Sequence, residues 1–103
     1  MSQFNRPPLD TGPLTKVVRH FRLAAGLTQS ELSGKCNIKQ QTVSRIERGK
    51  CHPPSKVLHD IARHLDIDRR YLFTIALLSA IEKPRWRHDY IRELVDELKA
   101  QAI

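Results

Sequence analysis

Residues 28–49, TQSELSGKCNIKQQTVSRIERG, contain the pattern that decides the fold. Thr28 and Glu31 form the capping box T-x-x-E, in which each side chain bonds the other residue's backbone N–H at the start of a helix. Asn37 tolerates the left-handed backbone conformation that ends many helices. The stretch therefore predicts a short helix over residues 28–36, a corner at residues 37–38, and a second helix over residues 39–48.

The second of these helices is predicted to have two distinct faces. With about 100° of rotation per residue, Val43 and Ile46 point into the core, toward Leu32 and Cys36 of the first helix. The opposite arc is entirely polar and is offered outward. It consists of Gln40, Gln41, Ser44, Arg45 and Arg48.

Apolar residues at helical spacing predict further helices on both sides of this pair. A preceding helix has one apolar face from Leu14 to Ala25, and Gly26 ends it. A fourth helix is expected to begin with Ser55 as its cap and to end at Asp66, after which Asp68 caps a fifth helix that starts at residue 69. The buried stripe of the fourth helix is Leu58, Ile61, Ala62 and Leu65.

The C-terminal part of the chain has more apolar surface than one small domain needs. Residues 71–81, YLFTIALLSAI, are apolar on more than one face and need partners on several sides. Pro84 suits the first turn of a sixth helix that extends to residue 103. We therefore expect residues 74–103 to form a helical hairpin that associates with a second copy of the chain. Its expected contact residues are Leu78, Ile81, Trp86, Ile91, Leu94 and Leu98.

The net charge of +7 is concentrated in one part of the chain. Residues 14–56 include nine basic and two acidic side chains, whereas the remaining residues include nine of each. Such an excess on the segment that holds the two short helices is typical of a protein that binds a nucleic-acid backbone, and a merely solvated basic surface is the alternative. Residues 1–13 hold three prolines and no apolar periodicity, so we expect a flexible arm there.

Composition and motifs argue against several other classes of protein. No apolar run is long enough to span a membrane or follows the basic start of a signal peptide, and we expect a cytoplasmic protein. Cys36, Cys51, His52 and His59 lack the paired spacing of a zinc site, so neither a metal nor a cofactor is expected. The sequence shows no nucleophile paired with a base, no pair of carboxylates in a pocket and no glycine-rich phosphate loop, so we do not expect an enzyme.

Several segments resemble the Cro/C1-type helix-turn-helix family, also called the Xre family, of phage repressors and bacterial regulators. They are Phe21-Arg22, GLTQSEL (26–32), NIKQQTVSRIERGK (37–50) and LHDIARHLDIDRRYLF (58–73). The joint spacing of GLTQ, the corner and S-x-I-E-x-G is rarely met by chance. The resemblance implies an all-α fold, in which residues 14–73 form a five-helix, lambda-repressor-like DNA-binding domain and the C-terminal helical hairpin is an addition.

The resemblance also implies roles for individual residues. Gln29 matches the family glutamine that holds a phosphate and buttresses the recognition helix, the helix that enters the DNA groove. Gln40 and Gln41 match the exposed start of that helix, where side chains reach base edges. Arg22 and Glu47 match an ion pair that joins the helix over residues 14–25 to the helix over residues 39–48.

The chemistry of these side chains agrees with DNA recognition. Glutamine can pair with adenine, and arginine with guanine, through two hydrogen bonds each. Lysine suits phosphates, which position a protein without reading sequence, and Lys39 stands where the family often has a capping serine or threonine. The expected DNA-binding residues are Gln29, Lys39, Gln40, Gln41, Ser44, Arg45, Arg48 and Lys50.

Two functions from different classes follow from these expectations. The first is a sequence-specific regulator of transcription, a repressor, that binds a palindromic operator in double-stranded DNA as a homodimer with residues 39–48 in the major groove. The second is an antitoxin-type module whose C-terminal hairpin binds and neutralises a partner protein such as a toxin. The two differ in whether residues 74–103 pack against a second copy or against a different protein.

Overall fold

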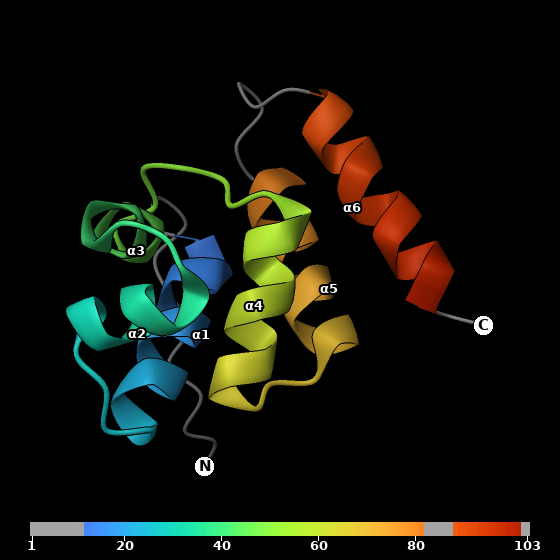
Figure 1. The fold of residues 1–103 in the computed structure, drawn as a ribbon. Helices are drawn as coiled ribbons and strands as arrows, with labels where there is room; N and C mark the ends of the chain where they lie inside the picture. The colour runs from blue at the N-terminus through green and yellow to red at the C-terminus, as the bar shows by residue number, and fades with distance from the viewer. Residues whose placement is uncertain (1–11, 82–87, 102–103) are drawn as a thin grey trace, which may run out of the picture.

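The fold is described by a computed structural model over residues 12–81 and 88–101. Within these residues the regular structure is helical, as predicted: α1 (Gly12–Ala24), α2 (Gln29–Cys36), α3 (Gln40–Glu47), α4 (Ser55–Leu65), α5 (Arg69–Ile81) and α6 (His88–Gln101) (Figure 1). The all-α fold class is confirmed. Five helices follow the order of a lambda-repressor-like domain, and α6 is an addition to them.

One hydrophobic core holds these helices together. α1 packs against α3 and α5, α2 packs against α3 and α4, and α6 packs along α5 and also contacts α4. Figure 1 shows α2 and α3 on one side of the molecule and α6 on the other, with α4 and α5 between them. The fully buried side chains at the centre of the core include Val18, Leu32, Val43, Leu58, Ile61, Leu72 and Phe73.

The start and end of α2 follow the local signals in the sequence. The hydroxyl of Thr28 accepts a hydrogen bond from the Glu31 N–H at 3.0 Å, and the Glu31 carboxylate accepts one from the Thr28 N–H at 2.8 Å. Asn37 ends the helix with φ 56°, in the left-handed region. The predicted capping box and corner are both confirmed, so α2 and α3 meet at a defined angle.

The corner between α4 and α5 is also built from short-range interactions. Asp66 ends α4 with φ 57°, a left-handed conformation that aspartate tolerates better than most residues. The Asp68 carboxylate then accepts hydrogen bonds from the backbone N–H groups of Arg70 at 2.8 Å and Tyr71 at 3.4 Å. The predicted cap of the fifth helix is confirmed.

The start of α4 differs from the prediction. Pro54 occupies the N-cap position and Ser55 is the first helical residue, so Ser55 is not the cap. Because the proline ring has no hydrogen-bond acceptor, the acceptor for the N-terminal end of α4 comes from another helix. Glu93 of α6 accepts hydrogen bonds from the Ser55 N–H at 3.0 Å and from the Ser55 hydroxyl.

The start of α1 also differs from the prediction. The helix includes Gly12 and Pro13, which were expected to belong to a flexible arm over residues 1–13. Proline is well suited to the first turn of a helix, where its missing N–H would have no partner. The buried Ser79 hydroxyl of α5 accepts a hydrogen bond from the Leu14 N–H at 2.8 Å and holds this end of α1 in place. Residues 1–11 lie outside the described residues.

The C-terminal helices share the core of the domain. α5 passes without a break through the boundary expected after residue 73, and Phe73 and Ala76 on this helix are 0% and 1% exposed. Leu94 of α6 is also 0% exposed and belongs to the same core cluster. Its expected role as a surface contact is therefore corrected, because the stripe that includes Leu94 faces α5 of its own chain. Trp86 lies outside the described residues.

Candidate nucleic-acid interface

The two faces of α3 have opposite environments. Val43 and Ile46 are 1% and 2% exposed and pack in the same core as Leu32 and Cys36 of α2. The polar arc on the other side of the helix faces solvent. Its members are Gln40, Gln41, Arg45 and Arg48, which are exposed, and Ser44, which is partly exposed. The turn between α2 and α3 therefore holds a rigid helix with its polar side chains directed outward.

A buried ion pair supports α3 from behind. The Arg22 guanidinium of α1 donates to the Glu47 carboxylate through Nε at 2.6 Å and through Nη2 at 3.0 Å. Each residue is 7% exposed. The hydrogen bond to Glu47 raises the pKa of Arg22 more than burial lowers it. Nη1 of Arg22 also donates to the Leu27 carbonyl at 2.8 Å, so one side chain joins α1, the turn before α2, and α3.

The ion pair extends to the surface through two glutamines. The Gln29 amide at the start of α2 donates to Glu47 Oε1 at 3.1 Å. Gln40, the first residue of α3, in turn donates to Gln29 Oε1 at 3.5 Å. The Gln29 amide nitrogen is thus engaged inside the protein, and the side chain links the buried pair to the exposed start of α3.

Basic residues flank α3 at both of its ends. Lys39 precedes the helix, its side chain makes no capping hydrogen bond, and the residue is exposed. At the other end Gly49 has φ 70°, a conformation that favours glycine, and the Lys50 N–H donates to the Arg45 carbonyl at 2.8 Å. Lys50 is exposed. The structure thereby places Lys39 and Lys50 at opposite ends of the polar arc, with Arg48 near the second end.

Three residues of α6 contact the segment that follows α3. Tyr90 donates from its hydroxyl to the Pro53 carbonyl at 2.6 Å. Glu93 bonds Ser55, and Glu97 Oε1 lies 2.9 Å from Nε2 of His59 on α4. The apolar periodicity of the sequence places Tyr90 on a buried stripe and indicates no role for the two glutamates. Tyr90, Glu93 and Glu97 are spaced three and four residues apart, which puts all three on one face of α6. That spacing was the available signal that they could share a contact surface.

The described cysteines and histidines do not assemble into a metal site. Cys36 is 2% exposed, and burial, together with the charge of Asp60, raises the pKa of its thiol to about 11. Burial also raises the pKa of Cys51. No group of three histidine, cysteine, aspartate or glutamate side chains that could hold a metal ion is present among the residues that the structure describes.

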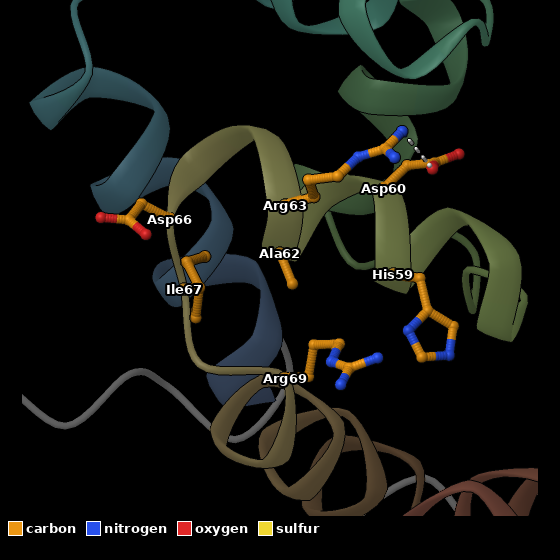
Figure 2. A pocket seen from close by; sticks show the side chains of 7 residues that line it. All are labelled: His59, Asp60, Ala62, Arg63, Asp66, Ile67 and Arg69. Atoms are coloured by element: carbon orange, nitrogen blue, oxygen red, sulfur yellow. Dashed lines mark hydrogen bonds and ion pairs between the residues drawn. The ribbon is translucent and has the colours of Figure 1, made fainter. Parts of the chain in front are cut away.

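A hollow lies at the junction of α4 and α5, away from the polar arc of α3. Figure 2 shows an ion pair on its wall, between Arg63 and Asp60, which are 3.5 Å apart. Arg69 extends toward His59 in the same view. The lining residues are His59, Asp60, Ala62, Arg63, Asp66, Ile67 and Arg69. None of them is among the residues expected to bind DNA.

The residues expected to contact a second copy fall into two groups. Leu78 and Ile81 of α5 are 47% and 56% exposed. Ile91 is partly buried, and Leu98 is partly buried against the same core as Leu94. Among the expected contact residues that the structure describes, those that are exposed are therefore on α5. None of the helices in residues 12–81 and 88–101 is long and apolar enough to cross a membrane.

A comparison with known protein families matches the part of the chain that includes α2 and α3. A family model described as helix-turn-helix matches residues 18–72. An uncharacterised HTH-type transcriptional regulator of Archaeoglobus fulgidus is 37% identical over 46 residues, which are 45% of this chain and 66% of that protein. The uncharacterised HTH-type transcriptional regulator y4dL of Sinorhizobium fredii is 38% identical over 58 residues, 56% of this chain and 30% of that protein.

A eukaryotic protein also matches part of the chain. The endothelial differentiation-related factor 1 homolog of Danio rerio is 37% identical over 65 residues, 63% of this chain and 42% of that protein. The chain thus spans less than two thirds of the length of each of these relatives. No solved structure matches the chain. The family model runs from Val18 of α1 to Leu72 of α5 and includes the whole α2–α3 unit, and the chain belongs to the Cro/C1-type (Xre) helix-turn-helix family.

Proposed function

We propose that this protein is a sequence-specific regulator of transcription that binds double-stranded DNA with α3 in the major groove. The observation that supports this best is the pairing of an exposed polar arc on α3 with a buried brace behind it. Arg22 and Glu47 fix the angle of α3 through two hydrogen bonds of 2.6 and 3.0 Å. A helix held in this way does not have to be ordered on binding, which removes that part of the entropic cost.

Base recognition is assigned to the outward side chains of α3. Gln41 can donate to and accept from an adenine edge, and Arg45, one turn further along, can donate twice to guanine. Gln40 lies closer to the protein because it donates to Gln29. We therefore assign Gln41 and Arg45 the larger share of sequence discrimination, together with Ser44, which lies between them along the helix. Gln40 is assigned a share in positioning the start of the helix.

Contacts to the DNA backbone are assigned to the residues at the edges of the arc. Lys39, Arg48 and Lys50 are exposed and positively charged on both ends of α3. Phosphate contacts of this kind hold a protein in register and make its affinity depend on salt. Gln29 lies at the start of α2, where its backbone N–H and the second hydrogen of its amide nitrogen can donate to a phosphate while the first hydrogen stays on Glu47.

We further propose that the protein acts as a homodimer on a palindromic operator and represses transcription. Leu78 and Ile81 are large apolar residues exposed on α5, and burying them between two copies would be favourable. We assign Ile91 of α6, which is partly buried, to the same contact. To bind two half-sites one turn of DNA apart, such a dimer would have to hold its two copies of α3 about 34–36 Å apart.

The partner on this apolar surface could instead be a different protein, as in an antitoxin-type module. The same exposure of Leu78 and Ile81 supports this second function, because an apolar surface binds any complementary partner. DNA binding by α3 is compatible with both functions. The mass of the purified protein in sedimentation distinguishes them: a dimer supports the first, and a monomer favours the second.

Selection of bound sites from random-sequence duplexes tests the proposed function. We expect enrichment of one motif with two-fold symmetry and half-sites centred about one helical turn apart. Enrichment of a single asymmetric site would contradict the dimer, and the absence of any enriched motif would contradict sequence-specific binding. The triple change Gln40→Ala, Gln41→Ala, Arg45→Ala is the control, and it should lose enrichment while the protein stays folded.

A further inference from the structure

The loop between α3 and α4 is attached to α6 by a tyrosine. The Tyr90 hydroxyl donates to the Pro53 carbonyl at 2.6 Å, and the Tyr90 ring meets the His52 ring edge-on, with 4.8 Å between the ring centroids. Burial raises the pKa of the Tyr90 hydroxyl above its usual value, with Glu93 and Cys51 adding to the shift. The hydroxyl therefore stays protonated and remains a donor throughout the pH range in which the protein would work.

A second residue of α6 holds the end of the same loop. α4 has Pro54 at its N-cap position and no side-chain cap within its own sequence neighbourhood. Glu93 supplies the acceptor, through hydrogen bonds from the Ser55 N–H at 3.0 Å and from the Ser55 hydroxyl. A carboxylate at this position also interacts favourably with the positive end of the helix dipole. The first turn of α4 is thus fixed by α6.

The loop held in this way begins at Lys50, the basic residue at the end of the polar arc. The Lys50 N–H donates to the Arg45 carbonyl at 2.8 Å, and Cys51 packs partly buried against the core. Pro53 follows Lys50 closely, with only Cys51 and His52 between them. The path of the loop is therefore fixed at its first residue by α3 and near its last residue by Tyr90, so the backbone that carries Lys50 has little freedom.

We propose that Tyr90 is a positioning residue for DNA binding, which acts through the loop to hold Lys50 where it contacts a DNA phosphate, and that Glu93 assists it. This inference rests on the proposed function of α3 and Lys50. Tyr90 does not itself contact DNA. Holding the loop before DNA arrives reduces the entropy lost on binding, and that gain applies to any DNA sequence because the contact is to the backbone.

The test measures affinity for a duplex of random sequence at two salt concentrations, with the variants Tyr90→Phe and Tyr71→Phe. Both changes remove one hydroxyl and no charge, but Tyr71 is 47% exposed on α5 and serves as the matched control. The proposal predicts that Tyr90→Phe weakens binding about threefold and at most about tenfold, since the loss of one part-buried hydrogen bond sets the upper limit. Tyr71→Phe should leave binding unchanged. Equal affinities for the two variants would overturn the proposal.

A double-mutant cycle shows whether Tyr90 acts through Lys50. If it does, Tyr90→Phe should add little to the loss caused by Lys50→Ala, whereas its effect should be fully additive with that of Gln41→Ala. Full additivity with Lys50→Ala would overturn the proposal, since a general loss of stability would add equally to both. A Lys50→Ala variant that binds as tightly as the unchanged protein would instead refute the phosphate contact itself, and with it both proposals about Lys50.

Glu93→Gln and Asp96→Asn provide an independent comparison. Each removes one negative charge from α6, which by itself strengthens attraction to DNA. Asp96 is exposed, so only that electrostatic gain is expected for Asp96→Asn. Glu93→Gln should bind more weakly than Asp96→Asn, by about two- to fivefold, because it loses the charged cap on Ser55. Equal affinities of these two variants would remove Glu93 from the proposal.

Discussion

Glu47 of α3 accepts two hydrogen bonds from Arg22 of α1, at 2.6 and 3.0 Å, and each residue is only 7% exposed. A third hydrogen bond to Glu47, from Gln29 at 3.1 Å, leads to the exposed Gln40. Because a buried charge is costly without its partner, this arrangement makes the angle of α3 a part of the stability of the fold. The helix that would meet DNA is therefore coupled to the packing of α1.

Glu47→Gln should lower the free energy of unfolding by about 3–5 kcal/mol, because it leaves the Arg22 guanidinium buried without a counter-charge. Chemical denaturation of both proteins measures the difference. Asp60→Asn is the control, since the partners of Asp60, Lys56 at 3.6 Å and Arg63 at 3.5 Å, have side chains that are 83% and 74% exposed, and the change should alter stability by less than about 1 kcal/mol. Similar losses for the two variants would mean that the buried Arg22–Glu47 pair contributes no more to the free energy of unfolding than an exposed ion pair does.

The two thiols should react with an alkylating reagent at very different rates. The pKa of Cys36 is raised to about 11 and its side chain is buried, whereas Cys51 is partly exposed with a pKa raised by burial. Because the thiolate is the reactive form, a raised pKa slows both cysteines at neutral pH, and both rates should rise as the pH increases toward those pKa values. Mass spectrometry of the native protein should find Cys51 modified first, and modification of Cys36 first would contradict the buried position.

Leu78→Glu combined with Ile81→Glu should convert a dimer into a monomer, because charges would be buried in the proposed contact. Sedimentation velocity at micromolar concentration measures the change. Leu23→Glu is the matched control: Leu23 is 56% exposed on α1, as is Ile81 on α5, and its replacement should leave the dimer intact. A monomeric unchanged protein, or a double variant that remains dimeric, would contradict the proposed dimer surface.

Leu94→Ala is expected to act on folding instead. Leu94 is 0% exposed in the core of its own chain, so its truncation should cost about 2–5 kcal/mol of stability. Thermal unfolding checks this expectation, with Val95→Ala on the partly buried flank of α6 as a milder comparison. A loss of self-association without a loss of stability would show that Leu94 faces a second copy after all.

The features that could be predicted from the sequence depend on residues close together along the chain. The capping box of Thr28 and Glu31 and the left-handed turn at Asn37 involve neighbours within one helical turn, and local chemistry determines them. The same holds for the cap at Asp68. The outward arc of α3 follows from helical periodicity alone, so the order of residues along the chain is enough to name its members.

The contacts that could not be predicted join distant segments through polar atoms. Glu93 caps Ser55 across 38 residues and Tyr90 bonds Pro53 across 37, and the helical spacing that puts both on one face of α6 does not identify these partners. Periodicity indicated that Leu94 is buried but not against which surface. The expected phosphate role of Gln29 came from the resemblance, and its hydrogen bond to Glu47 shows why this position also supports the fold.

The central claim is that Gln41 on the outward face of α3 recognises bases while Lys50 contacts the DNA backbone. Comparing Gln41→Ala and Lys50→Ala on the selected operator and on random duplexes, over a range of salt, tests it most directly. Gln41→Ala should reduce discrimination between the two DNAs by about 1–3 kcal/mol. Lys50→Ala should weaken both complexes alike and lower the salt slope by about one. Equal effects of both variants on operator and random DNA would contradict the claim.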